Sequence, residues 1–208
     1  AYNDVCSQIR QGGVRRGANL GLLNISHPDI LEFISCKKDR TKLQNFNISV
    51  GINGRFLDLV KNHKWHWLIN PKDSSQRTQF SAFELLDLIC QNIWEHGEPG
   101  IAFLDIINSK NPIPWMGRIE STNPCGEQPL LPHESCNLGS IDVSKFAKNK
   151  SVDWSRLEEV VEIAVRFLDD VIDAYKYPNV RIKRKTQMNR KIGLGIMGWA
   201  DLLLKLKI

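Results

Sequence analysis

Residues 46–60 read FNISVGINGRFLDLV and hold the pattern that indicates the fold class. Apolar side chains dominate Phe46 to Ile52, which predicts a strand, and the amphipathic segment from Arg55 to Val60 predicts a helix after it. The same order precedes this stretch, where Leu20–Ile25 reads as a buried strand and Pro28 opens an apolar helical face. Strands that alternate with helices predict an α/β fold with parallel strand pairing.

The rest of the chain continues this alternation. Strands are predicted at 65–69, 101–106 and 192–198, and residues 2–11 read as the end of a helix that breaks at 12–18. A further helix is predicted between a Ser81–Glu84 capping box and Gly97. A long helix is predicted at 154–175, and the residues on its apolar side are Leu157, Val161, Ala164, Leu168, Val171 and Tyr175. Five prolines between residues 112 and 140 predict a mostly extended loop. Because no repeat and no linker divides the chain, we expect one domain over residues 1–208.

The composition excludes several classes of protein. With 42% hydrophobic residues and a net charge of +5, the chain is not expected to be intrinsically disordered. Five cysteines among 208 residues are too few for a disulfide scaffold and favour a reducing, cytoplasmic setting. No apolar run reaches about 18 residues and the first residues lack the features of a signal peptide, so neither a membrane span nor secretion is expected.

The positive charge is concentrated near the C-terminus, and the rest of the chain is close to neutral. The cations of this run are Arg181, Lys183, Arg184, Lys185, Arg190 and Lys191. Such a run can bind nucleic acid or polyphosphate, but no aromatic residues are interleaved with it, as stacking on single strands requires. We therefore expect a solvated loop or helix start after Pro178 and keep nucleic-acid binding as a secondary hypothesis.

The residues that carry chemistry lie at 121–130 (STNPCGEQPL). The two prolines of this segment disfavour helix, so an extended backbone is expected. On an extended backbone, Asn123, Cys125 and Glu127 would share one face. An amide, a thiol and a carboxylate on one face form a usable active-site set.

Other interpretations of these residues stay open. Cys125 could be a small buried hydrophobic residue, or it could form a hydrolase dyad with His133, although nothing marks an oxyanion hole. No metal site is expected, because Cys125 and Cys136 are 11 residues apart and neither belongs to a CxxC pair.

Residues 123–132 (NPCGEQPLLP) and 134–140 (ESCNLGS) together resemble the active-site finger loop of the ribonucleotide reductase catalytic subunit. Further stretches recur in that family in the same order, namely 11–19 (QGGVRRGAN), 27–30 (HPDI), 45–50 (NFNISV) and 193–198 (GLGIMG). The short spacing of the two finger-loop cysteines resembles the adenosylcobalamin-dependent, class II branch. The resemblance implies that the chain is part of the family's ten-stranded α/β barrel, with a finger loop at about 121–140.

The resemblance also implies roles for single residues. Cys125 matches the cysteine that becomes a thiyl radical, Glu127 the general base on the 3′-hydroxyl of the ribonucleotide, and Asn123 the amide that holds that hydroxyl. Cys136 matches one half of the dithiol that supplies two electrons, and the other half is expected upstream of this sequence. The remaining cysteines do not match the family motif of that second thiol and are interpreted as structural: Cys6, Cys36 and Cys90.

Partners and cofactor follow from the same resemblance. Lys42 and Gln44 fall on the loop that links a nucleotide effector to the substrate, although an exposed polar loop explains each of them equally well. The expected cofactor is adenosylcobalamin, and the alternative is that a separate metal-containing subunit supplies the radical. A thioredoxin-like protein is the expected reductant. The family barrel is longer than 208 residues, so we expect a central fragment that associates with complementary segments or with itself and is inactive alone.

Overall fold

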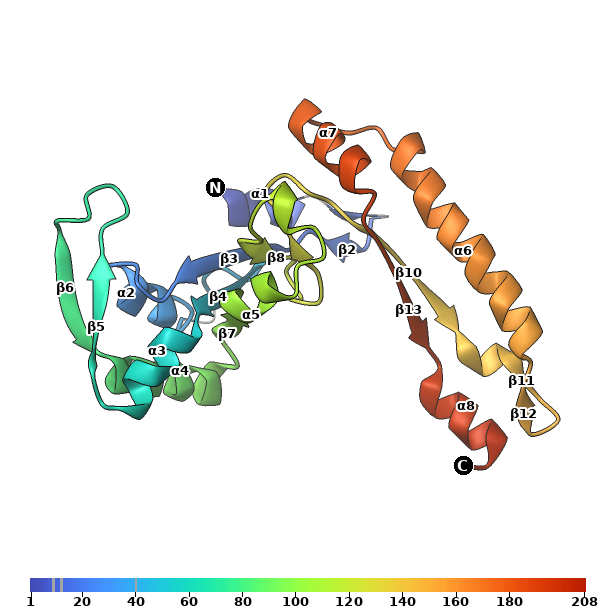
Figure 1. The fold of residues 1–208 in the computed structure, drawn as a ribbon, viewed down its shortest axis with the longest axis horizontal. Helices are drawn as coiled ribbons and strands as arrows, with labels where there is room; N and C mark the ends of the chain where they lie inside the picture. Colours follow the sequence, from blue (N-terminus) through green and yellow to red (C-terminus); the bar gives the residue numbers. More distant parts are fainter. Residues whose placement is uncertain (9, 12, 40) are drawn as a thin grey trace. The chain divides into compact units, whose positions relative to one another are not determined.

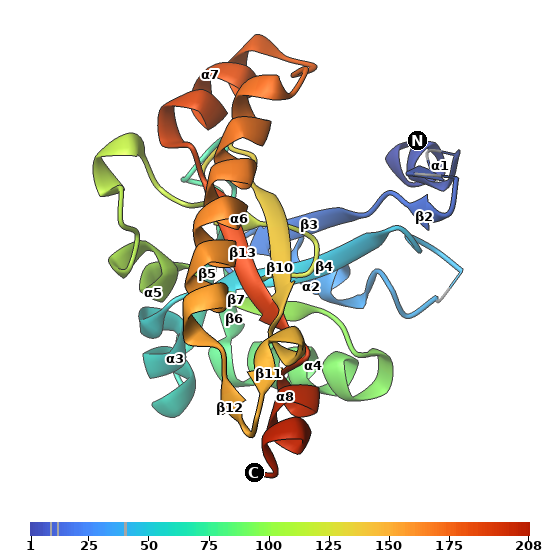
Figure 2. The same cartoon turned by 90° about the vertical axis from the view of Figure 1, so that its right-hand side faces the viewer.

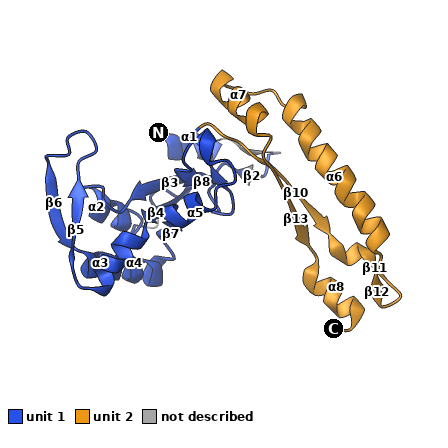
Figure 3. Cartoon of the chain, in the orientation of Figure 1, with its two compact units in different colours: residues 1–132 blue, residues 133–208 orange. Residues whose placement is uncertain are grey.

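The computed structural model describes residues 1–8, 10–11, 13–39 and 41–208 (Figure 1, and turned by 90° in Figure 2). They form two compact units, residues 1–132 and residues 133–208, which Figure 3 colours separately. The N-terminal elements are α1 (Tyr2–Gln8) and the antiparallel pair β1 (Arg10–Gln11) and β2 (Arg15–Arg16). The helical end predicted at 2–11 is thus confirmed only as far as Gln8, and the Gly12 of the predicted break lies outside the described residues.

The first unit is built on a three-stranded parallel sheet in the order β3, β4, β7. The central strand β4 (Phe46–Ile52) pairs with β3 (Asn19–Asn24) on one side and with β7 (Gly100–Phe103) on the other. The strand predicted at 46–52 is confirmed at both ends. The predicted parallel pairing is also confirmed, since both neighbours of β4 run in its direction.

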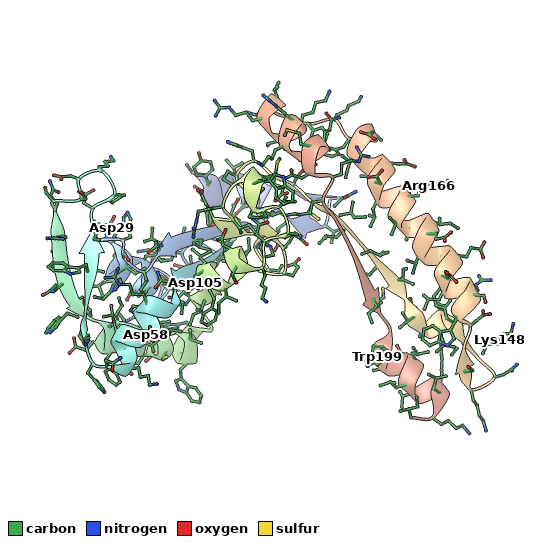
Figure 4. The ribbon with its side chains drawn as sticks, viewed as in Figure 1. Asp29, Asp58, Asp105, Lys148, Arg166 and Trp199 are labelled. Carbon is green, nitrogen blue, oxygen red and sulfur yellow. The ribbon has the colours of Figure 1, made fainter. Side chains whose placement is uncertain are left out.

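The strand predicted at 101–106 is too long. β7 ends at Phe103, and α5 (Leu104–Ser109) begins there. Side chains hold this helix against other segments: the Asp105 carboxylate (labelled in Figure 4) accepts a hydrogen bond from the Gly54 N–H at 2.7 Å, and Asn108 exchanges two hydrogen bonds of 2.9 Å with the backbone of Ile119. The apolar pattern does not reveal these contacts, because they join residues that are far apart in the sequence.

Three helices pack around the apolar core of the first unit. They are α2 (Ile30–Ser35), α3 (Gly54–Lys61) and α4 (Ala82–His96). Caps define the starts of α3 and α4 and the end of α4. The Asn53 side chain accepts the Phe56 N–H at 2.9 Å, the Ser81 hydroxyl accepts the Glu84 N–H at 3.3 Å, and Gly97 ends α4 in a left-handed conformation. The serine cap of the predicted capping box and the glycine stop are thereby confirmed. The core residues are Ile25, Ile30, Ile34, Val50, Ile52, Phe56, Leu68, Ala82, Leu85 and Ile89.

A two-stranded antiparallel hairpin completes this unit. β5 (Trp65–Ile69) has the predicted bounds, and its partner β6 (Arg77–Ser81) was not predicted. Polar residues dominate β6, and only its last two are partly buried, so it lacks the apolar alternation that marks a strand. Pairing with β5 supplies its hydrogen bonds instead.

The second unit contains a two-stranded parallel sheet. β10 (Asn137–Asp142) pairs with β13 (Ile192–Met197), and α6 (Trp154–Ala174) runs along both strands, as Figure 2 shows. The remaining elements are the 3-10 helix η2 (Val143–Phe146), the strands β11 (Ala147–Lys148) and β12 (Ser151–Val152), and the helices α7 (Val180–Asn189) and α8 (Trp199–Leu206). The strand predicted at 192–198 is confirmed as far as Met197, and α8 follows it.

Two predictions between residues 112 and 175 need correction. The loop predicted at 112–140 ends earlier, because residues from Asn137 onward join β10, and a 3-10 helix η1 (Pro114–Met116) lies within it. The apolar side predicted for the long helix is only partly buried. Leu168 and Ile172 are buried, whereas Val161 and Tyr175 are exposed, because only part of α6 faces the two-stranded sheet.

The α/β fold class is confirmed by these parallel sheets. Within the described residues, the sheets have three and two parallel strands and do not close into the ten-stranded barrel that the resemblance implies. Among the described helices, none combines the length and the apolar character that a membrane crossing requires.

Candidate active site

Cys125 lies at the tip of a short hairpin in the first unit. β8 (Ser121–Thr122) and β9 (Pro129–Leu130) pair antiparallel, and residues 123–128 connect them. The Asn47 side chain, at the start of β4, donates a hydrogen bond of 2.7 Å to a carbonyl of this connection and so ties the hairpin to the parallel sheet.

The backbone around Cys125 is turned and not extended, so the predicted alternation of side chains does not apply. Gly126 adopts a left-handed φ of 85° and donates its N–H to the Asn123 carbonyl at 3.0 Å. The Asn123 Oδ1 also accepts the Gln128 N–H at 3.0 Å, which closes the turn. A glycine that tolerates positive φ and an asparagine that bonds to a nearby backbone amide favour a turn over a strand. Asn123, Cys125 and Glu127 therefore lie in one turn, with the last two exposed.

A cavity of about 540 Å³ lies beside the thiol. Its walls come from the start of β4, the connection from α4 to β7 and the turn itself. The lining residues include Asn47, Ser49, Glu98, Gly100 and Cys125. Gly100 lies so close to Ser49 that a Cβ there would be 2.8 Å from the Ser49 Oγ, so a glycine keeps this part of the wall open. The cavity gives a small molecule direct access to Cys125.

One charged residue that the sequence did not point to, Glu98, lines this cavity, and it is paired with a second, Lys37. Glu98 accepts the Ile48 N–H at 3.1 Å and forms an ion pair with Lys37. Lys37 also donates to the Phe46 carbonyl at 2.6 Å, so the pair is anchored to the first residues of β4. The position of Glu98 between Gly97 and Pro99, just before a strand, is the only sequence signal that could have identified it.

The predicted effector loop leads into β4. Lys42 is exposed and lies 3.8 Å from the Asp39 carboxylate, and Gln44 is exposed as well. Neither side chain belongs to the described lining of the cavity. Among the described residues, the loop runs directly into β4, whose first residues line the cavity.

Cys136 belongs to the second unit and immediately precedes β10. Its thiol is partly buried and lines a mostly apolar cavity of about 240 Å³ with side chains from α6 and α7. Burial raises the pKa of the Cys136 thiol, against the opposite effect of the nearby Lys191 ammonium, while the Glu134 carboxylate adds to the increase.

The other cysteines lie outside these two cavities. Cys6 accepts a hydrogen bond from the Asn19 side chain at 2.7 Å, burial raises the pKa of Cys36, and Cys90 is exposed on α4. All five cysteines are free thiols. In the described part of the chain, no cluster of three or more His, Cys, Asp or Glu side chains is arranged to hold a metal ion.

The basic run forms α7 and its C-terminal end. Arg181, Lys183 and Arg184 are exposed on the helix, as expected for a solvated helix start. Arg190 donates to two aspartates of α6, at 2.8 Å and 2.9 Å, and Lys191 pairs with Glu134 at 2.7 Å. The prediction of a solvated helix start is confirmed, and part of the run serves the packing of the second unit.

Comparisons with known proteins identify the family of this chain. Residues 1–208 match the family described as "Ribonucleotide reductase, barrel domain". The chain is 55% identical over 202 residues to the vitamin B12-dependent ribonucleoside-diphosphate reductase of Thermoplasma acidophilum and 48% identical over 208 residues to that of Mycobacterium tuberculosis. It is 28% identical over 241 residues to the ribonucleoside-diphosphate reductase subunit alpha of Chlamydia pneumoniae.

These matches cover 96%, 100% and 99% of the chain, but 26%, 30% and 23% of the respective relatives. The chain thus spans less than a third of the length of the relatives it matches. Because the family match extends from the first to the last residue, the chain belongs to the ribonucleotide reductase family, to the part described as its barrel domain.

Proposed function

We propose that the protein reduces ribonucleotides to deoxyribonucleotides by radical chemistry at Cys125. The observation that carries this proposal is an exposed thiol at the tip of a turn, beside a cavity of about 540 Å³, in a chain 55% identical to a named ribonucleoside-diphosphate reductase. A cavity of this size suits a small-molecule ligand. A ribonucleoside diphosphate is the first substrate to test, since both relatives with the higher identity are named for it.

Each residue of the turn has a proposed role. A thiyl radical on Cys125 takes the hydrogen atom from C3′ of the ribose, and Glu127 accepts the proton of the 3′-hydroxyl. The Oδ1 of Asn123 is occupied by the Gln128 N–H, which leaves the Nδ2 group to donate to a substrate hydroxyl. The exposure of Cys125 and Glu127 supports these assignments, because both groups are open to a ligand in the cavity.

The net reaction needs two electrons. The substrate loses its 2′-hydroxyl as water and gains a hydrogen at that carbon, while two thiols give up two hydrogens and close to a disulfide. Cys136 is proposed as one of these thiols, with the second supplied outside residues 1–208. A thioredoxin-like dithiol protein would then reopen the disulfide.

Adenosylcobalamin is the proposed cofactor, as the names of the relatives suggest. When bound, it supplies the unpaired electron that the reaction requires. An exposed Cys125 beside an open cavity fits a cofactor that must come close to the sulfur. The alternative is a separate metal-containing subunit, and the subunit alpha among the relatives keeps it open.

The remaining partners are proposed from the same assignment. Lys42 and Gln44 would sense a nucleotide effector through the loop that enters β4. Complementary segments or a second copy of the chain would cover exposed apolar residues such as Trp94 and Leu204. The proposed setting is the cytoplasm, where thiols stay reduced.

Turnover of the protein expressed from its complete gene tests the proposal. We expect deoxyribonucleotide formation that requires adenosylcobalamin and a dithiol and is abolished by Cys125→Ser. The matched control is Cys90→Ser, which removes another exposed thiol of the first unit and should keep full turnover. Equal activity of both variants would contradict the proposed radical site, and turnover without the cofactor would favour the separate radical-generating subunit.

A second candidate function is a folded segment that binds nucleotide or complementary segments without turnover. It is favoured by one observation, namely that the chain spans 26% and 30% of the length of the Thermoplasma and Mycobacterium relatives. Assaying the 208-residue chain beside the complete gene product separates the two functions. Turnover by the 208 residues alone would exclude the second candidate.

A further inference from the structure

Glu134, two residues before Cys136, has a buried carboxylate that forms an ion pair with Lys191. The Glu134 side chain has no exposed surface, and its Oε2 lies 2.7 Å from the Lys191 Nζ. The other carboxylate oxygen, Oε1, accepts a hydrogen bond of 2.7 Å from the Asn189 Nδ2. Burying a carboxylate costs free energy unless charged or polar groups bond to it. Here both oxygens have such a partner, so the arrangement belongs to the packed interior and is not a surface contact.

The ion pair joins the segment of Cys136 to the strand beside it. In the parallel register of the second unit, Asn137 of β10 pairs with Ile192 of β13. Cys136 immediately precedes the first of these residues and Lys191 immediately precedes the second. Because neighbouring strands lie about 5 Å apart, the lysine runs beside the cysteine.

The residues on both sides of Cys136 are held as well. The Ser135 hydroxyl lies 2.8 Å from the Thr186 hydroxyl of α7, and the Asn137 side chain donates to the Leu168 carbonyl of α6 at 2.8 Å. The thiol is therefore carried by a segment in which the residue before it and the residue after it each bond to a different helix. Little freedom is left to the Cys136 backbone.

Opposite charges flank this thiol. The Lys191 ammonium favours the thiolate and the Glu134 carboxylate disfavours it, while burial also disfavours it. The other titratable groups that line the same cavity are the phenols of Tyr175 and Tyr177. Since the thiolate is the species that attacks in thiol–disulfide exchange, these charges bear on the rate at which Cys136 reacts.

We propose that Glu134 and Lys191 are positioning residues for Cys136: their ion pair holds the thiol-bearing segment against β13, and their opposite charges set how readily the sulfur reacts. This inference rests on the proposed function, which makes Cys136 a reducing thiol. Neither residue touches the substrate in this assignment, and both act through the cysteine.

The rate of Cys136 alkylation tests the inference. The protein expressed from its complete gene is treated with iodoacetamide at neutral pH, and the labelled peptides of Cys136 and of the exposed Cys90 are followed by mass spectrometry. Cys90 serves as the internal reference, because it lies in the other unit. Labelling does not require turnover, so an inactive enzyme leaves this test intact, and a failed test leaves the proposed activity standing.

The two charges should act in opposite directions. We expect Glu134→Gln to accelerate the labelling of Cys136 at least threefold, and Lys191→Met to slow it at least threefold. Lys191→Arg keeps the cation and should stay within twofold of the wild type, as should the control Lys183→Met, which removes an exposed lysine of α7. A purely structural role predicts instead that both single changes loosen the site and accelerate labelling.

Two outcomes would overturn the inference. One is that Glu134→Gln and Lys191→Met change the rate in the same direction, and the other is that both stay within twofold of the wild type. If Lys191→Met does not fold, because it removes the cation that faces a buried carboxylate, the double variant with Glu134→Gln replaces it. That double variant must react more slowly than Glu134→Gln alone, and equal rates would refute the role of the lysine.

Discussion

Asn123 has two tasks in the proposed site, and substitutions can separate them. Its Oδ1 closes the turn by accepting the Gln128 N–H at 3.0 Å, and its Nδ2 group is assigned to the substrate. Asn123→Asp keeps the acceptor oxygen and loses the donor. Asn123→Ala loses both groups.

The magnitude follows from the hydrogen bond that closes the turn. One such bond contributes about 0.5–1.5 kcal/mol net, so its loss should raise the exchange rate of the Gln128 amide by about twofold to about tenfold. We expect this increase for Asn123→Ala, whereas Asn123→Asp should keep the exchange rate of the wild type within about twofold. Both variants should lose turnover by a similar factor of about two to ten, because both lack the amide donor.

Amide hydrogen exchange and turnover are measured on the same preparations. Thr122→Val is the matched control in the same hairpin: it removes a hydroxyl that donates to the Asn123 carbonyl at 2.9 Å but leaves the Gln128 bond in place. Unchanged exchange of the Gln128 amide in Asn123→Ala would refute the closing role. Full turnover of Asn123→Asp would refute the assignment of Nδ2 to the substrate.

Three further predictions concern stability, each measured by urea unfolding. Gly198→Ala should destabilise the protein by at least about 1–2 kcal/mol, because φ is 70° and the new Cβ would collide with the Asp142 carboxylate; an unchanged midpoint would contradict this. The Arg190 guanidinium lowers the pKa of the Asp169 and Asp173 carboxyls, to which it donates hydrogen bonds. Its ion pairs therefore stabilise the fold above about pH 4, and this stabilisation is lost as the pH falls through the lowered pKa values. The stability gap between the wild type and Arg190→Gln should therefore shrink on acidification, and a constant gap would show that the charges are not responsible. Phe56→Ala should cost about 3–5 kcal/mol, since the ring is fully buried, while Leu57→Ala, next to it and exposed, should cost less than about 1 kcal/mol; equal losses would argue against the assigned core.

Local patterns predicted the regular elements well where each element carries its own signal. The bounds of β4 and β5 follow from apolar runs within the strands, and those of α4 from the serine and the glycine that directly flank it. The errors occur where contacts with another segment of the chain determine the secondary structure. β6 is polar and becomes a strand only by pairing with β5, and the strand expected at 101–106 is cut short at Phe103 where α5 begins.

The candidate site shows the same division. The finger-loop motif pointed to Cys125 and Cys136, but the expectation of an extended chain around Cys125 was wrong. Proline restricts only its own residue and the one before it, whereas the hydrogen bond from Gln128 to Asn123 and the left-handed Gly126 set the turn. The roles assigned to these residues stay predictions until the variants above are measured.

By itself, the sequence determined the α/β class, the parallel pairing and the family, because strand and helix periodicity and an ordered set of motifs are local properties of a chain. Only the tertiary structure decided what surrounds each thiol: the cavity beside Cys125, whose Glu98 pairs with Lys37, and the Glu134–Lys191 pair beside Cys136. The partners of the second pair are 57 residues apart in the chain. No local pattern encodes such a contact, since it exists only once folding buries the Glu134 carboxylate and brings the Lys191 ammonium to it.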